Sequence, residues 1–283
     1  MQKLLIVGCG DIGIKLASVL PAAVSVYGLR RDISKLPARI IGLCADVTEP
    51  DSLKALADMN FDAVVISLTP GEASDERYQK IYVQGTAQLL AALNHECLQR
   101  LIFVSSTSVY GQNDDSWVDE HSVTEPTRYS GKRLLQAEQL CLDYGRQHQV
   151  ATSVLRFAGI YGPGRGRLLQ DVLAGKQSPP LYSNRIHSDD CAGFLQHLLQ
   201  LPVAQLQPCY IGVDDLPVRL NEVKDWLAQQ LACELQTVAA SSAQRAGSKR
   251  CSNRGMKQSG YQLLYGNYQA GYTQLLAELI YTG

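Results

Sequence analysis

The sequence predicts an α/β fold, in which a doubly wound parallel sheet is joined to a smaller mixed C-terminal lobe. Short apolar runs alternate with amphipathic stretches along the first part of the chain, and several of the runs are apolar throughout. Such runs are typical of parallel strands that helices cover on both faces. The alternation ends after Tyr161-Gly162-Pro163-Gly164, where glycines, prolines and short strands mix with helices.

The apolar runs predict six strands, at residues 4–7, 24–29, 40–44, 63–68, 101–105 and 152–157. Helical spacing predicts helices at about 12–20, 78–94 and 132–147, and Thr48-Glu49-Pro50 is typical of a helix start. Further helices are expected in the lobe, at about 189–200, 220–232 and 268–279. We therefore expect residues 1–165 to form the sheet domain, with 184–205 returning to it, and residues 166–283 to form the smaller lobe.

The composition is that of a globular protein with nearly balanced charge. The 283 residues include 26 Lys and Arg against 27 Asp and Glu. This balance gives no electrostatic basis for binding nucleic acid or an anionic membrane. The first apolar run stops at Gly8, too early for a signal peptide or a membrane span, so we expect a cytoplasmic protein. The eight cysteines contain no C-x-x-C pair, so no zinc site is expected.

A glycine-rich turn follows the first predicted strand and opens an amphipathic helix. It reads Gly8-Cys9-Gly10-Asp11-Ile12-Gly13, a G-x-G-x-x-G pattern in the context that makes it informative. Gly8 permits the tight turn, Gly10 lets a pyrophosphate approach the backbone, and Gly13 lets the helix pack on the sheet. The motif predicts a Rossmann-type dinucleotide site that includes Asp11 and Ile12; the alternative is a strand–helix turn that happens to contain glycine.

The second predicted strand ends at Leu29-Arg30-Arg31-Asp32. A carboxylate here usually holds the ribose hydroxyls of NAD, whereas an arginine accommodates the 2′-phosphate of NADP. We therefore prefer NADP, bound through Arg30 and Arg31, over NAD bound through Asp32. The other expected cofactor contacts follow the third and fourth strands, at Asp46, Val47, Ser67, Leu68 and Thr69.

Several motifs resemble those of the short-chain dehydrogenase/reductase superfamily, in its extended NAD-dependent epimerase/dehydratase branch. Besides the glycine turn, they are Ala45-Asp46-Val47, Val83-Gln84-Gly85-Thr86, Phe103-Val104-Ser105-Ser106-Thr107-Ser108-Val109-Tyr110-Gly111, Leu155-Arg156, Gly159-Ile160-Tyr161-Gly162-Pro163-Gly164 and Asn184-Arg185-Ile186-His187-Ser188-Asp189-Asp190. The resemblance covers nearly the whole chain.

The resemblance implies a catalytic serine, a tyrosine acid or base, and a lysine that lowers the tyrosine pKa. Ser106 matches the serine, with Thr107 as the fallback. Hydride transfer is chemistry that the nicotinamide cofactor supplies. Thr107, Tyr161 and Arg185 are candidates for contact with substrate.

The family's Y-x-x-x-K motif is degenerate in this chain, and two registers are open. If Gly131 and Glu138 set the frame, Ser130 fills the tyrosine position and Leu134 the lysine position. If Tyr129 is the family tyrosine, Arg133 replaces the lysine. The two registers differ by about 100° of helix rotation. We favour the first, and keep Tyr129 and Arg133 as catalytic candidates under the second.

These motifs leave two functions open. The first is an NAD(P)-dependent oxidoreductase or epimerase-like enzyme that acts on a small hydroxyl or carbonyl substrate, including sugar-derived ones. The second is a non-catalytic NADP-binding sensor or regulatory module, suggested by the degenerate motif. A homodimer is an assembly that the fold allows by analogy.

Overall fold

The computed structural model describes residues 1–236 and 247–282 and divides the chain into two compact units. The first unit contains Met1–Val109, Glu125–Arg156 and Ala192–Tyr210. The second contains Tyr110–Thr124, Phe157–Cys191 and Ile211–Gly283.

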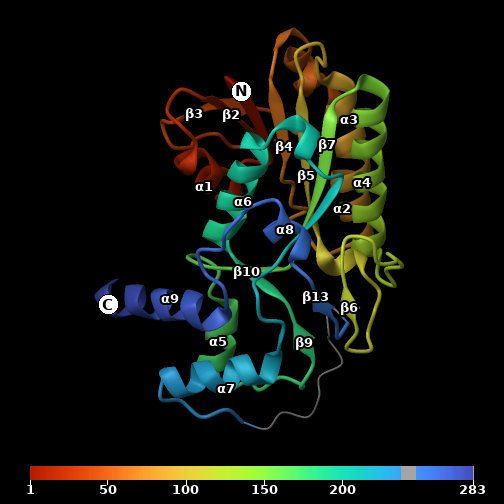
Figure 1. Ribbon diagram of the computed structural model, residues 1–283. Helices are drawn as coiled ribbons and strands as arrows, with labels where there is room; N and C mark the ends of the chain where they lie inside the picture. The colour runs from red at the N-terminus through yellow and green to blue at the C-terminus, as the bar shows by residue number, and fades with distance from the viewer. Residues whose placement is uncertain (237–246, 283) are drawn as a thin grey trace. The chain divides into compact units, whose positions relative to one another are not determined.

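A seven-stranded sheet with the strand order β11-β7-β5-β4-β1-β2-β3 forms the centre of the fold (Figure 1). Its strands are β1 (Lys3–Val7), β2 (Ser25–Arg30), β3 (Ile40–Cys44), β4 (Ala63–Ile66), β5 (Arg100–Ser106), β7 (Ala151–Phe157) and β11 (Cys209–Gly212). The pairs β1–β2, β2–β3, β1–β4 and β4–β5 are parallel, which confirms the predicted doubly wound sheet. The strand order reverses at β1, and ligands of such sheets bind at this switch point.

Helices cover both faces of the sheet in the first unit. Figure 1 shows α1 (Asp11–Val19) and α6 (Ser188–Gln200) on one face, and α3 (Thr86–Ala92) and α4 (Tyr129–His148) on the other. The side chain of Gln196 in α6 donates to the carbonyl of Val19 in α1 at 2.6 Å. Because both faces are covered, the central strands are apolar throughout; in β4 no residue is more than 1% exposed.

Three elements differ from the prediction. The segment after Thr48 is a 3-10 helix, η1 (Pro50–Asp58). The helix expected at 78–94 is present as a continuous helical stretch from Asp75 to Ala92, but its middle is π-helical: α2 (Asp75–Tyr78) is followed by η2 (Gln79–Gly85) and then by α3. The seventh strand, β11, was not predicted, since a run of four residues is too short to be recognised by its period. Two short 3-10 turns, η3 (Thr107–Val109) and η4 (Val203–Gln205), complete this part of the chain.

The second unit has a mixed architecture of short strand pairs and helices. The strands are β6 (Trp117–Val118), β8 (Gly159–Tyr161), β9 (Tyr182–Ser183), β10 (Arg185–His187), β12 (Val218–Arg219) and β13 (Arg250–Cys251). The pairs β8–β10 and β6–β13 are parallel, and β9–β12 is antiparallel. The helices are α5 (Arg167–Leu173), α7 (Leu220–Gln230), α8 (Arg254–Gln258) and α9 (Tyr268–Thr282).

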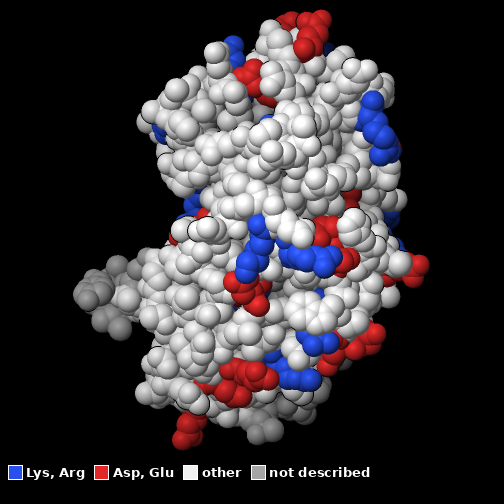
Figure 2. All heavy atoms as spheres, in the orientation of Figure 1, with Lys and Arg blue, Asp and Glu red and all other residues white. Residues whose placement is uncertain are grey.

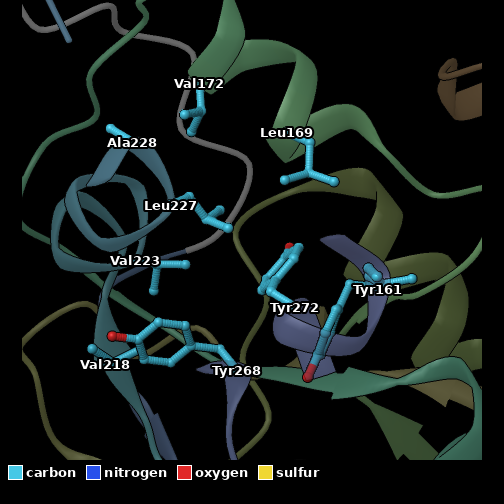
Figure 3. Packing of buried hydrophobic residues seen from close by; sticks show 10 residues of the cluster. Tyr161, Leu169, Val172, Val218, Val223, Leu227, Ala228, Tyr268 and Tyr272 are labelled. Atoms are coloured by element: carbon cyan, nitrogen blue, oxygen red, sulfur yellow. The ribbon is translucent and has the colours of Figure 1, made fainter. Parts of the chain in front are cut away.

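A hydrophobic cluster holds this second unit together. Figure 3 shows its side chains converging from α5, α7, α9 and the neighbouring strands. The rings of Tyr161 and Tyr272 stack with their centroids 4.6 Å apart. The buried members are Tyr161, Leu169, Val172, Val218, Val223, Leu227, Ala228, Tyr268, Tyr272 and Leu275.

Candidate functional site

The chain turns sharply at Gly8, directly after β1. The φ angle of Gly8 is 73°, and a Cβ atom there would lie 2.5 Å from the carbonyl oxygen of Ser67. The Gly8 amide donates to the carbonyl of Leu29 in β2 at 2.9 Å, which ties the turn to the next strand. Only glycine combines this backbone angle with so close an approach.

The next two glycines leave space for a phosphate group and for close packing. A Cβ at Gly10 would meet only the Gly8 carbonyl oxygen, 3.8 Å away. A Cβ at Gly13 would lie 2.9 Å from Cγ2 of Ile6 in β1, so glycine lets α1 pack close to the sheet. The N-terminus of α1 offers backbone N–H groups and a partial positive charge, which favour an anion. The turn therefore fits the pyrophosphate of a dinucleotide.

A pocket of about 270 Å³ lies beside this turn, where β1, β2, β3 and β4 end. Of the expected cofactor contacts, those that line it are Gly8, Gly10, Arg30, Arg31, Asp46, Val47, Leu68 and Thr69. Asp32, the contact expected for NAD, lines the pocket as well. The other lining residues were not expected from the sequence; they are Cys9, Leu29, Ala45 and Ile81. Asp11, Ile12 and Gly13 form the first turn of α1, and Ser67 packs on Gly8.

The basic residues after β2 are arranged differently from the neighbouring acid. Nη1 of Arg30 donates to the carbonyl of Cys9 at 3.2 Å, which directs the guanidinium towards the glycine turn. The Asp32 carboxylate accepts from the backbone N and the hydroxyl of Ser34, at 3.0 and 2.6 Å. These hydrogen bonds hold the pKa of Asp32 below its ordinary value. The Arg30 guanidinium thus faces the glycine turn, whereas the Asp32 carboxylate is hydrogen-bonded within its own loop, to Ser34.

Asp46 is fixed at the end of β3 by Thr48. One carboxylate oxygen of Asp46 accepts from the backbone N and the hydroxyl of Thr48, both at 2.9 Å. Partial burial acts to raise the pKa of Asp46, but these hydrogen bonds and the charges of Arg31 and Arg77 outweigh it, so the pKa is lowered. The sequence did not indicate Arg77, which comes from α2 and carries no motif.

We call residues Leu68–Pro70 the rim loop, because they follow β4 and two of them line the pocket. Two side chains from α2 and η2 hold it. The Tyr82 hydroxyl donates to the carbonyl of Leu68 at 3.2 Å, and Nε of Arg77 donates to the carbonyl of Pro70 at 3.0 Å. Ile81, one residue before Tyr82, also lines the pocket.

Ser106 lies at the carboxyl end of β5, as expected for the serine that contacts substrate. Its Oγ accepts from the backbone N of Ser108 at 3.1 Å. Because one lone pair of the oxygen is engaged in this way, the hydroxyl hydrogen is directed elsewhere and is able to donate. Thr107, the fallback, begins the η3 turn.

A buried ion pair contacts Ser105, the residue before Ser106. The Ser105 hydroxyl donates to Oε1 of Glu138 in α4 at 2.5 Å. Arg156 of β7 donates to the same carboxylate from Nε at 3.1 Å and from Nη2 at 2.7 Å. The two charged side chains are 10% and 4% exposed. This network joins α4 to the ends of β5 and β7, a role that the sequence did not reveal.

The packing of α4 favours the first of the two registers. A Cβ at Gly131 would lie 2.5 Å from both the Ser108 carbonyl oxygen and Cβ of Pro126. Leu134, in the position of the family lysine, is 4% exposed. Gly131, Leu134 and Glu138 therefore share the buried face of the helix.

The side chains of Tyr129 and Arg133 contact residues of α2. The Tyr129 ring meets the Tyr78 ring edge-on, with centroids 5.4 Å apart. Arg133 forms a two-pronged ion pair with Asp75, from Nε to Oδ1 at 2.7 Å and from Nη2 to Oδ2 at 3.1 Å. This ion pair raises the pKa of Arg133 and lowers that of Asp75.

Tyr161, an expected substrate residue, lies in the core of the second unit. Its ring stacks on Tyr272, and its hydroxyl donates to the carbonyl of Asn267 at 3.4 Å. Burial raises the pKa of its phenol.

Arg185, the other expected substrate residue of this unit, is 5% exposed. Its Nη2 donates to the hydroxyl of Ser183 at 2.6 Å, and its guanidinium lies 5.6 Å from the centre of the Tyr268 ring. The Arg185 charge acts on Asp214, whose Oδ2 accepts no hydrogen bond from the described residues. Burial raises the pKa of Asp214 to about 7, although the charge of Arg185 acts to lower it. No sequence pattern pointed to Asp214.

Surface charges, groups of metal-binding side chains and the length of the helices bear on whether the protein binds other ligands or a membrane. Figure 2 shows basic and acidic side chains close to one another on the face in view. Among the described residues, no group of three or more His, Cys, Asp and Glu side chains is placed to hold a metal ion. None of the helices within 1–236 and 247–282 has the length and apolar character needed to cross a membrane.

Known proteins share both the sequence pattern and the fold. The model of the NAD-dependent epimerase/dehydratase family matches residues 4–203. Protein YeeZ of Escherichia coli K12 is 34% identical over 217 residues, which are 71% of this chain and 74% of YeeZ. The N-acetyl-α-D-glucosaminyl-diphospho-ditrans,octacis-undecaprenol 4-epimerase of Escherichia coli O157:H7 is 28% identical over 81% of this chain and 72% of its own length.

Solved structures agree with this relationship. One from Methylobacillus flagellatus, assigned to the NAD-dependent epimerases/dehydratases, superposes with a TM-score of 0.84 at 37% identity and covers 98% of each chain. The UDP-glucuronic acid 4-epimerase of Bacillus cereus in complex with NAD has the same fold, with a TM-score of 0.77 at 20% identity over 93% of each chain. The chain belongs to the NAD-dependent epimerase/dehydratase family.

Proposed function

We propose that the chain binds NADP in the pocket beside Gly8 and Gly10 and acts on a hydroxyl or carbonyl group of a small, sugar-derived substrate. The observation that carries the cofactor preference is the contrast after β2. Arg30, Arg31 and Asp32 all line the pocket, but Arg30 points its guanidinium at the glycine turn. The Asp32 carboxylate, which would hold the ribose hydroxyls of NAD, is hydrogen-bonded to Ser34. A guanidinium in this place suits the 2′-phosphate of NADP.

The substrate class rests on the chemistry of Ser106 and on the relatives. The Ser106 oxygen accepts from the Ser108 amide, and its hydroxyl hydrogen can still be donated to a carbonyl or alkoxide oxygen. When bound, the nicotinamide cofactor supplies hydride transfer. The 4-epimerase of Escherichia coli, named for a glucosaminyl lipid, supports a sugar-derived substrate.

Proton transfer is the step in which this chain departs from its family. Leu134 replaces the lysine charge that would lower the pKa of a phenol. We do not assign proton transfer to Tyr129, because its ring packs on Tyr78 and Arg133 is paired with Asp75. These contacts also favour a second candidate function, a non-catalytic NADP-binding module.

The cofactor proposal is tested by measuring dissociation constants for NADPH and NADH by calorimetry. We expect tighter binding of NADPH, and we expect Arg30→Ala to weaken NADPH binding at least about tenfold, the loss of one charge-assisted contact, while binding of NADH changes little. Lys35→Ala is the matched control, since it removes a nearby exposed charge that does not line the pocket. Equal affinities for the two cofactors, unchanged by Arg30→Ala, would refute the preference.

The choice between enzyme and module needs a second measurement. Turnover of NADPH or NADP with a panel of sugar-derived hydroxyl and carbonyl compounds, lost in Ser106→Ala with cofactor binding retained, supports the enzyme. Binding without turnover for any compound in the panel supports the module.

A further inference from the structure

We infer that Tyr129 and Arg133 form a brace that holds the rim loop of the dinucleotide pocket, so that they control cofactor binding from a distance. This inference rests on the proposed function, because the pocket must bind a dinucleotide for the brace to matter. Both residues start on α4 and reach the rim loop Leu68–Pro70 through α2 and η2.

The first route is a chain of aromatic rings. Tyr129 meets Tyr78 edge-on at 5.4 Å between centroids, and Tyr78 meets Tyr82 at 5.3 Å. The hydroxyl of Tyr82, a residue that is 9% exposed, donates to the Leu68 carbonyl at 3.2 Å. If the Tyr129 ring is displaced, Tyr78 loses its contact, and Tyr82 in turn loses the support of Tyr78. Tyr82 is the residue that holds Leu68, which lines the pocket.

The second route is an ion pair followed by a helix cap. Arg133 donates two hydrogen bonds, of 2.7 and 3.1 Å, to the carboxylate of Asp75, the first residue of α2. The Ser74 hydroxyl caps the same turn by accepting from the Arg77 amide at 3.2 Å. Nε of Arg77 then donates to the Pro70 carbonyl at 3.0 Å. The ion pair thus fixes the turn from which Arg77 holds the far end of the rim loop.

The helix that carries Arg77 and Tyr82 has an unusual local structure. The α2 helix has four residues and continues into a π-helical segment of seven. The two run on into α3 without a break, from Asp75 to Ala92. A π-helical stretch inside such a helix is rare and is frequently found at functional sites. Tyr129 and Arg133 contact the turn directly before this stretch.

The brace also gives Arg77 a defined place near Asp46 of the pocket. The Arg77 charge helps to lower the pKa of Asp46, which lines the pocket, so the guanidinium lies within electrostatic reach of that carboxylate. A loosened α2 turn would move this charge away from Asp46. The loss is expected to weaken binding of NADPH and NADH alike, in contrast to the loss of Arg30.

If Tyr129 acts as part of the brace, its ring matters and its hydroxyl does not; for a catalytic phenol the hydroxyl matters. The edge-on contact with Tyr78 depends on the Tyr129 ring, whereas acid or base catalysis depends on the hydroxyl. Tyr129→Phe should keep NADPH affinity within about twofold, and Tyr129→Ala should weaken it about three- to tenfold, the range expected for an aromatic pair. If Tyr129→Phe weakens NADPH binding as much as Tyr129→Ala does, the ring chain is refuted.

The ion pair is tested with Arg133→Gln, Asp75→Asn and the double variant, again by calorimetry with NADPH. Each single change should weaken binding about two- to fivefold, and the double variant should be no weaker than either one, because one contact is lost in all three. Arg146→Gln is the matched control: it makes the same change at an exposed arginine of α4 whose ion pair is with Asp143. Additive losses in the double variant would contradict the ion-pair route.

Hydrogen exchange without cofactor separates failure of the brace from failure of the proposed function. In the unliganded protein, amides in residues 68–82 should exchange faster in Tyr129→Ala and Arg133→Gln than in the original chain, while amides of β1 and β4 stay unchanged. Faster exchange in a chain that binds no dinucleotide would refute the proposed function and leave the brace. Unchanged exchange and unchanged NADPH affinity in both variants would refute the brace alone.

Discussion

Asp214 is predicted to make the stability of this protein fall as the pH rises towards neutrality. The residue follows β11, is 1% exposed, and accepts one hydrogen bond, from the amide of Leu216 at 3.2 Å. Burial raises its pKa from 3.8 to about 7; the Arg185 charge opposes this shift, and Asp215 and Asp190 add to it. The perturbation that tests it is Asp214→Asn, which keeps the shape and an acceptor for Leu216 but cannot ionise.

The sign follows from proton binding in the two states. The folded protein holds the Asp214 proton more tightly than the unfolded chain, so the unfolded chain loses its proton first as the pH rises. The stability contributed by the neutral carboxyl is fully present below pH 3.8 and is lost as the pH rises to about 7. Since each pKa unit is worth about 1.4 kcal/mol, the shift from 3.8 to about 7 corresponds to at most about 4 kcal/mol of unfolding free energy.

The assay is urea unfolding of both proteins at several pH values between 5 and 8. Asp214→Asn should gain stability relative to the original chain as the pH rises, by about 2 kcal/mol or more over this range, with no further gain above it. Asp215→Asn is the matched control. Bonds from Lys257 and Asn253 lower the pKa of Asp215 despite partial burial, so this residue is ionised in both the folded and the unfolded chain from pH 5 to pH 8. Asp215→Asn should therefore lower the stability by a nearly constant amount over this range. A difference between Asp214→Asn and the original chain that stays constant from pH 5 to pH 8 would refute the reasoning.

Two further substitutions test the packing. Gly271→Ala in α9 should destabilise the protein by about 1–3 kcal/mol, because overpacking outweighs the helix preference of alanine: a Cβ there would lie 2.7 Å from ring carbons of Tyr161. Urea unfolding checks this against Gly166→Ala, where a Cβ meets nothing within 4 Å and no such loss is expected. Glu138→Gln should cost about 3–5 kcal/mol, since it leaves the buried Arg156 without its carboxylate partner; a loss below about 1 kcal/mol in the same assay would show that the charges are not paired in a desolvated site.

The fold was predictable where structure depends on short stretches of sequence. Strands covered on both faces are apolar throughout, so six of the seven strands stand out as runs, and β4 is the clearest of them. The π-helical segment η2 was not predictable, because it depends on contacts with distant parts of the chain. Gly85, for example, approaches Val47 so closely that a Cβ would lie 2.7 Å from its Cγ2.

The candidate site divides in the same way. The glycine turn is local, so its spacing alone predicts where the chain must turn and leave room for phosphate. Arg77 and Tyr82 carry no motif, and they reach the pocket only because α2 and η2 fold back over the rim loop. The partner of Arg133 was equally hidden, since Asp75 is 58 residues away in sequence.

The two faces of α4 explain how this chain keeps the pocket while its motif has changed. Ser130 and Leu134 are one turn apart and share a face with Glu138, whereas Tyr129 and Arg133 are one turn apart and point about 100° away from that face. The tight contact of Gly131 with the Ser108 carbonyl oxygen prevents the helix from rotating to bring the second pair inwards. In the first register, Ser130 and Leu134 therefore take the places of the family tyrosine and lysine, while the glycine turn, the arginines after β2 and Ser106 are all present. We therefore expect cofactor binding without the family's usual proton donor, and a turnover measurement with NADPH decides whether catalysis accompanies binding.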